Sequence, residues 1–340
     1  MGTDIILNNT HLPQRTIYDE RYTTGQYDHR SAIRVLTAER EALAEAVDRA
    51  LRSNEAAKTV NLFDFGYGTG RVTNELARRF LPDHPVAKGK SLRIVAYDVS
   101  SVGLRKAQQA LCAVGFTSDG TLTWQQDNAS GYIAGSVRRE EAGLAVTVVF
   151  VHGCEEQSPD VMCKLAFEAS DGQPYSVTTS WYSGLGHISG QSLRSEYFRQ
   201  LGELTSPSGE MVLSMSSTGD LVEIQPEWER RRVDGDVGGF PVDAPGDVVY
   251  LTELGQANFY HVFGTDLNDH MASITAADQH WWLRGIRYPD PEFESPDAEQ
   301  ANYRRVRAAN VGKRGRPWTK ADFDEFHTVA AFRSPADPDR

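Results

Sequence analysis

Short apolar runs alternate with segments of helical periodicity through the first two thirds of the chain. Runs at residues 60–65, 92–97, 146–151 and 175–181 are continuous enough to predict strands buried on both faces of a parallel sheet. Between and around them, apolar residues recur at helical spacing over about 31–52, 72–80, 100–114, 159–169 and 191–204. This alternation predicts an α/β fold with a doubly wound, mainly parallel sheet.

The position of the third strand has two interpretations. Residues 122–126 and 146–151 are both strand-like, and a polar, glycine-punctuated segment separates them. We favour 146–151, because its apolar run is the more continuous. An insertion would then occupy about 118–144. The alternative places the third strand at 122–127, with Asp127 and Asn128 at the ligand edge.

The two ends of the chain are less regular. Residues 1–55 are predicted to form a polar, irregular arm followed by a helix, and residues 56–340 the core. After Ser217 a segment rich in charge, Gly and Pro predicts a second insertion at about 218–246. Strand candidates follow at 247–254 and around 329–332.

One turn carries the strongest chemical signal. Gly66, Gly68 and Gly70 follow the first strand in a G-x-G-x-G spacing, and a helical pattern follows them. Glycines at such a turn let the backbone pass close to a ligand. Asp98 ends the second strand, where an acid can accept both hydroxyls of a ribose. The spacing differs from the G-x-G-x-x-G of dinucleotide-binding dehydrogenases.

The stretch DFGYGTGR followed by AYDVS resembles the first two motifs of class I S-adenosylmethionine-dependent methyltransferases. A loop ending at His187, the helix at 191–204 and the PSG turn resemble the fourth and fifth motifs, with Ser208 in place of a usual glycine. The resemblance implies a seven-stranded sheet whose last strand, near residue 329, is antiparallel. It also implies S-adenosylmethionine as the cofactor and methyl transfer as the activity.

The resemblance implies a set of cofactor-binding residues. These are Asp64, Gly66, Gly68, Gly70, Asp98, Val99, Glu155, Tyr18, Tyr22 and Tyr27. Asp98 would hold the ribose; its alternative role is a cap for the next helix. Asp64 would bond the backbone amides of the glycine loop or meet the amino group of the cofactor.

The remaining cofactor residues come from two segments. Glu155 or Glu156, after the favoured third strand, would lie near the adenine. The three tyrosines belong to the N-terminal arm, which is either a lid over the cofactor or a segment packed on the surface.

Candidates for the acceptor side are fewer. His187 is a candidate general base because it follows the fourth strand at the carboxyl edge; the alternative is that it braces a backbone carbonyl. Trp181, Tyr182 and His261 are candidates for substrate binding, with core packing as the alternative. No metal site is expected.

Composition limits the partners. The 340 residues include 35 Lys plus Arg and 47 Asp plus Glu, so the formal charge of −12 argues against a general nucleic-acid binder. The three cysteines indicate a reduced, cytoplasmic protein, and no signal peptide or membrane span is expected. Trp281 and Trp282 are candidates for packing or for a homodimer interface.

We therefore expect methyl transfer to an oxygen, nitrogen or carbon atom of a small organic molecule. Two rivals remain: a methyltransferase acting on protein or RNA, and a non-catalytic domain that keeps the cofactor fold.

Overall fold

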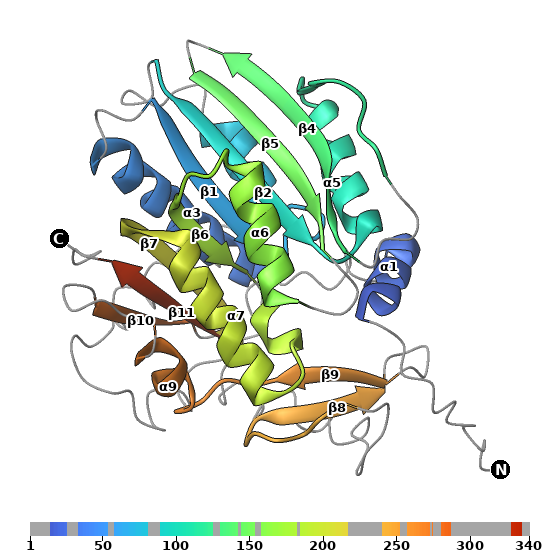
Figure 1. Cartoon of the computed structure of the whole chain (residues 1–340), viewed down its shortest axis with the longest axis vertical. Helices are drawn as coiled ribbons and strands as arrows, with labels where there is room; N and C mark the ends of the chain where they lie inside the picture. The colour runs from blue at the N-terminus through green and yellow to red at the C-terminus, as the bar shows by residue number, and fades with distance from the viewer. Residues whose placement is uncertain are drawn as a thin grey trace, which may run out of the picture.

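The structure is a computed structural model of the whole chain. It describes residues 14–25, 33–53, 58–80, 89–124, 130–141, 144–153, 158–181, 184–216, 240–251, 257–272, 274, 280–286 and 328–334. Figure 1 shows a twisted sheet with helices on both faces and a separate two-stranded hairpin beyond one edge.

A nine-stranded sheet forms the centre of the molecule, in the order β10-β11-β7-β6-β1-β2-β5-β4-β3. Its five parallel strands are β7 (Thr205–Ser216), β6 (Tyr175–Ser180), β1 (Thr59–Phe65), β2 (Ser91–Asp98) and β5 (Leu144–His152). The antiparallel strands are β10 (His280–Ile286), β11 (Thr328–Ser334), β4 (Tyr132–Glu141) and β3 (Thr117–Ser118). The predicted doubly wound sheet is confirmed: β10 to β5 make its seven-stranded core, and β4 and β3 extend it.

The strand order reverses beside β1. From β1 the chain winds outward through β2 and β5, and it then returns to β6 on the other side of β1 before reaching β7. In open α/β sheets, ligands bind outside the carboxyl ends of the strands at such a reversal. The fold therefore points to the tips of β1, β2 and β6.

The favoured third strand is confirmed. β5 pairs in parallel with β2 along its whole length, and Val146, Val148 and Phe150 are buried. Residues 122–124 form no strand, although the Thr123 amide donates to the Ala134 carbonyl beside β4. Asp127 and Asn128, the residues of the alternative, lie outside the described residues.

Helices cover the two faces of the sheet. α3 (Ile33–Ser53) and α5 (Ser101–Cys112) pack on one face, and α6 (Pro159–Ala169) and α7 (Gln191–Leu204) on the other, as Figure 1 shows. Leu43, Val47 and Leu51 of the predicted apolar face of α3 are buried. The predicted cap of α5 is also present, because the Ser100 hydroxyl accepts from the Gly103 amide at 3.0 Å.

Several elements differ from the sequence prediction or were not predicted. The expected irregular arm contains helix α1 (Gln14–Thr24), and the helix after the glycine turn is a short α4 (Thr73–Glu75) continued by π-helical η1 (Leu76–Phe80). The loop of His187 is a 3₁₀ turn, η2 (Gly184–His187). Beyond β7, β8 (Asp247–Leu251) pairs with β9 (Ala257–His261) in a separate two-stranded sheet, and α9 (Leu267–Ala272) follows.

Among the described helices, none combines the length and apolarity needed to cross a membrane.

The placement of β5 gives a stability prediction. Val148 is fully buried, whereas Val242 is 57% exposed, so the same substitution can be compared at both positions. Val148→Ala should lower the free energy of unfolding by about 2 kcal/mol, because it removes buried methyl groups and leaves a cavity. Val242→Ala should change it by less than about 0.5 kcal/mol. Urea unfolding followed by circular dichroism measures both; equal effects would contradict the buried position of β5.

Candidate active site at the carboxyl edge

The glycine turn is anchored to the end of β2. The amides of Gly66 and Tyr67 both donate to the Tyr97 carbonyl, at 2.9 and 3.0 Å. Gly66, Gly68 and Gly70 have φ values of +74°, +54° and +71°, a region that residues with a Cβ rarely occupy. The turn therefore requires its three glycines in this conformation.

Asp98 joins this turn to α5. One carboxylate oxygen accepts from the Gly68 amide and the other from the Ser100 amide, each at 2.7 Å. The side chain is 7% exposed, and burial raises the pKa of Asp98 to about 6 against the lowering effect of the two amides. Because each carboxylate oxygen has two lone pairs, Asp98 retains acceptor capacity for further donors.

Asp64 differs in detail from the prediction. Its side chain accepts from the hydroxyls of Thr73 and Thr179, the latter at 3.0 Å, rather than from amides of the glycine loop. Thr73 starts α4 and Thr179 belongs to β6, so one buried carboxylate ties β1 to both. Burial raises the pKa of Asp64 to about 7, although the two threonine bonds act to lower it. Asp64 thus supports the turn from below.

Gly103 was not predicted as a site residue. A Cβ added there would lie 3.2 Å from the carbonyl atoms of Gly68 and 2.9 Å from Cε2 of Tyr22. Only glycine lets α5 approach the turn this closely. A glycine within an otherwise helical pattern is the signal that pointed to such a contact.

Helix α1 lies across this part of the edge. Tyr22 is 3% exposed and its hydroxyl lies against Gly68. Lys106 of α5 donates to the Tyr22 carbonyl, and Asp19 accepts from the Ser100 hydroxyl and, at 3.4 Å, from the Val102 amide. α1 is therefore held at the N-terminal end of α5, over the glycine turn.

His187 lies under the other side of α1. Its Nδ1 is 3.2 Å from the Phe259 carbonyl, which can only accept, so Nδ1 carries the proton and Nε2 the lone pair. The centre of its ring lies 5.3 Å from that of Tyr18, in an edge-on contact, and 4.9 Å from that of Tyr260, in a tilted one. Burial, and next the positive charge of Arg21, lower the pKa of His187 to about 3. The residue is thus a neutral hydrogen-bond acceptor braced by a backbone carbonyl.

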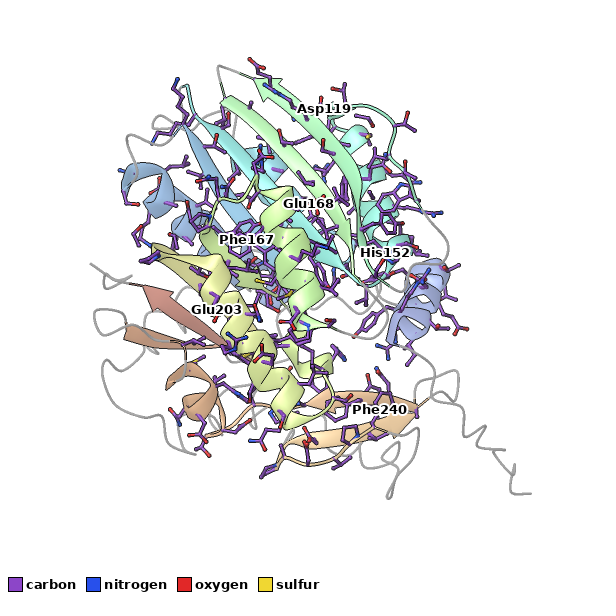
Figure 2. The ribbon with its side chains drawn as sticks, viewed as in Figure 1. Asp119, His152, Phe167, Glu168, Glu203 and Phe240 are labelled. Atoms are coloured by element: carbon purple, nitrogen blue, oxygen red, sulfur yellow. The ribbon has the colours of Figure 1, made fainter. Side chains whose placement is uncertain are left out.

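Two other predicted residues are described at this edge. The Val99 carbonyl accepts from Nε2 of His152, at 3.0 Å; His152 was not predicted as a site residue and ends the buried strand β5 (Figure 2). Trp181 is 6% exposed and packs in the core on the α3 and α5 side. Its ring therefore serves core packing, the alternative to substrate binding. Tyr27, Glu155 and Tyr182 lie outside the described residues.

The structure does not bring His261 to the site as predicted. It is fully buried between Asp247 and Asp266, with its two ring nitrogens 2.7 and 2.8 Å from their carboxylates. Both nitrogens are occupied by these carboxylates, so His261 has no ring nitrogen left for a substrate. In the described ranges, no group of three or more His, Cys, Asp or Glu side chains is arranged to hold a metal ion.

No protein-family model and no curated protein matches the sequence. The chain is similar to a methyltransferase from Methanosarcina mazei at 12% identity and a TM-score of 0.42, over 83% of this chain and 94% of that one. It is also similar to the CcbJ methyltransferase from Streptomyces caelestis at 16% identity and a TM-score of 0.40, over 86% and 90%. For the DhpI–SAM–HEP complex the values are 10% and 0.42, over 98% and 100%.

The fold is of the class I methyltransferase type. Its features are the strand order around β1 and the glycine turn after that strand. Within this methyltransferase-type fold, the described tips of β1, β2 and β6 hold Asp64, the glycine turn, Asp98 and, above them, Tyr22.

The raised pKa of Asp64 gives a pH-dependent prediction. Because its pKa is about 7 in the folded chain against 3.8 ordinarily, the wild type loses stability as pH rises from about 4 to about 7. Asp64→Asn cannot ionise, so its free energy of unfolding relative to wild type should rise by up to about 4 kcal/mol between pH 4 and pH 8. Urea unfolding across this range measures the difference. Asp119→Asn, at an exposed aspartate, is the control, and a difference for Asp64→Asn that stays constant with pH would contradict the assignment.

Proposed function

We propose that this protein is an S-adenosylmethionine-dependent methyltransferase that acts on a small organic molecule. The observation that carries the proposal is the pair of hydrogen bonds that Asp98 accepts from the Gly68 and Ser100 amides. Asp98 thereby holds a positive-φ glycine turn at the tip of β1 against the tip of β2, beside the reversal of strand order. This is the place where an open α/β sheet binds a nucleotide-like ligand.

The residues present fit a nucleoside cofactor. Gly66 is exposed and has no side chain, so a ligand can approach the backbone of the turn. Asp98 keeps lone pairs for two ribose hydroxyls, and bonds to a carboxylate are charge-assisted. The aromatic rings of Tyr18 and Tyr22 suit the positive charge of a sulfonium. Bound S-adenosylmethionine would supply an electrophilic methyl group.

The chain itself supplies position and exclusion of water. The reacting atoms must lie in line at about 3–3.5 Å, so most of the rate enhancement expected from the protein comes from orientation. Asp64 and Asp98 hold the turn in place, and α1 covers it. We infer that α1 is the lid predicted from the sequence and that it moves aside to admit the cofactor.

His187 is proposed to orient the methyl acceptor. With Nδ1–H donated to Phe259, its Nε2 can accept a hydrogen bond from an N–H or O–H of the acceptor. A group with a pKa of about 3 takes up a proton poorly near neutral pH, so it is a weak general base. This supports an acceptor that can attack the methyl group without His187 first removing a proton, whether the attacking atom is oxygen, nitrogen or carbon.

Other features of the proposal follow from composition. The net charge of −12 supports a small organic acceptor over RNA, and we propose a cytoplasmic enzyme. A homodimer is compatible with this function. The rival from another class is a domain that binds the cofactor without catalysis; methyl transfer from labelled S-adenosylmethionine to a panel of small amines, phenols and acids distinguishes the two.

Cofactor binding is the direct test. Wild-type protein should bind S-adenosylmethionine in isothermal titration calorimetry. Asp98→Ala should weaken binding by about 1–3 kcal/mol, or roughly 5- to 150-fold, because it removes charge-assisted bonds. Asp119→Ala, at an exposed residue beside β4 and away from His152 (Figure 2), should bind as wild type does.

The stability of each variant serves as its control. Asp98→Ala must retain a cooperative thermal transition for the comparison to count, since Asp98 also holds the glycine turn. Absence of binding by wild type at hundreds of micromolar cofactor, or equal affinity of wild type and Asp98→Ala, would overturn the proposal.

A further inference from the structure

The hairpin of β8 and β9 cannot hold its position alone. Two-stranded hairpins are marginally stable in water, and within the described part of the chain this one pairs with no strand of the main sheet. Yet it carries two groups that contact His187, the Phe259 carbonyl and the Tyr260 ring. The orientation of His187 therefore depends on how the hairpin is anchored.

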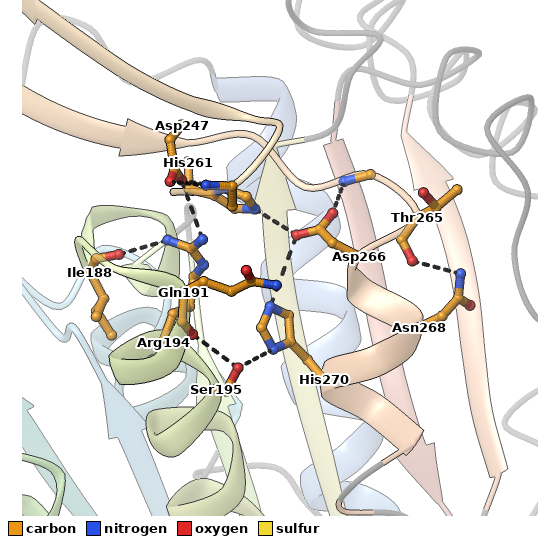
Figure 3. A network of polar contacts seen from close by, with 12 residues as sticks. Ile188, Gln191, Arg194, Ser195, Asp247, His261, Thr265, Asp266, Asn268 and His270 are labelled. Carbon is orange, nitrogen blue, oxygen red and sulfur yellow. Dashed lines mark hydrogen bonds and ion pairs between the residues drawn. The ribbon is translucent and has the colours of Figure 1, made fainter. Parts of the chain in front are cut away.

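A buried charge network provides an anchor (Figure 3). Asp247 on β8 and Asp266 before α9 flank His261 on β9, at 2.7 Å from Nδ1 and 2.8 Å from Nε2. Both ring nitrogens of His261 are therefore engaged by carboxylates of other elements. For both aspartates burial is the largest single effect and acts to raise the pKa. The contacts with His261 together with Arg194 at Asp247 and the Gly264 amide at Asp266 outweigh it, so the pKa of each is lowered.

Arg194 connects this network to α7. Its guanidinium is fully buried and donates to Asp247 at 3.2 Å and to the Ile188 carbonyl at 2.8 Å. The other oxygen of Asp247 accepts from the amides of Asp243 and Ala244, at 3.1 and 2.9 Å. The buried pair of Arg194 and Asp247 is thus supported by further hydrogen bonds, which a buried ion pair needs to be favourable.

The network sits on the same strand as the groups that contact His187. Phe259, Tyr260 and His261 are consecutive residues of β9. A shift of β9 along its axis would move the Phe259 carbonyl away from Nδ1 of His187. It would also move the Tyr260 ring away from the His187 ring. Fixing His261 between two carboxylates opposes that shift. Moving His261 away from Asp247 or from Asp266 would take a partner from that buried carboxylate, which is unfavourable.

We propose that His261 is a positioning residue: its contacts with Asp247 and Asp266 set the place of β9 and so orient His187. This inference concerns a histidine that has a role in catalysis only under the proposed function. The orientation itself can be measured without cofactor or substrate.

Nuclear magnetic resonance of the histidine side chains tests the proposal. Long-range ¹H–¹⁵N spectra report which ring nitrogen carries the proton, and comparison with His187→Gln assigns the signals of His187. In wild type, His187 should be a single Nδ1–H form that stays neutral to below pH 4. In His261→Gln, His187 should lose the single form, and its pKa should rise by about one unit or more as water reaches the ring.

A second variant and a control complete the design. Asp266→Asn replaces one carboxylate of the network by an amide, whose oxygen can still accept from His261. It should change the His187 signals in the same direction, and it keeps the test possible if His261→Gln does not fold. Asp119→Asn is the control, because Asp119 is an exposed residue beside β4, outside the network of Asp247, His261 and Asp266.

The outcomes are separable. Changed His187 signals in His261→Gln or Asp266→Asn, with Asp119→Asn unchanged, support the proposal. Unchanged His187 signals in a folded His261→Gln or Asp266→Asn, or an equal change in Asp119→Asn, overturn it. Failure of wild type to bind S-adenosylmethionine would defeat the proposed function while leaving this result intact.

Discussion

The bond between Asp98 and two backbone amides is the interaction on which the site depends. A turn with three positive-φ glycines is a costly conformation for the chain to hold without support. Asp98 accepts from Gly68 on one side and Ser100 on the other, and the Tyr97 carbonyl takes two more amides of the turn. The tip of β1, the tip of β2 and the start of α5 are therefore one unit before any ligand binds.

The other side of the strand reversal is supported differently. Asp64 connects β1 to Thr179 of β6 with a buried carboxylate, and Arg194 connects α7 to the β8–β9 hairpin through Asp247. Both devices use burial, where an ionised group is tolerated only with good partners. Asp64 thus supports the start of the glycine turn, and the network around His261 connects α7 to the hairpin that contacts His187. Helix α1 covers the turn.

Local patterns predicted much of this fold. β5, α6 and α7 lie at the residues where the apolar pattern predicted them. A long apolar run or an apolar helix face is buried whichever elements it packs against, so the pattern alone locates the element. The glycine turn was predictable because its backbone adopts positive φ angles, which favour glycine at these positions. The cap of α5 by Ser100 follows the same logic, because a cap involves neighbours in sequence.

Contacts between distant residues could not be predicted in this way. Thr179 is 115 positions from Asp64, and Phe259 is 72 positions from His187. His261 was assigned to the substrate from its residue type alone, whereas partners 14 and 5 residues away on other elements give it a buried, paired position. Helix α1 was missed because its sequence is polar and its burial of Ile17 and Tyr22 comes from docking on the rest of the molecule.

A crystal structure with S-adenosylhomocysteine bound tests the central claim most directly. We predict that the nucleoside lies across the tips of β1 and β2, with both ribose hydroxyls within hydrogen-bonding distance of the Asp98 carboxylate. A nucleoside bound elsewhere, or a ribose that makes no contact with Asp98, would contradict the account.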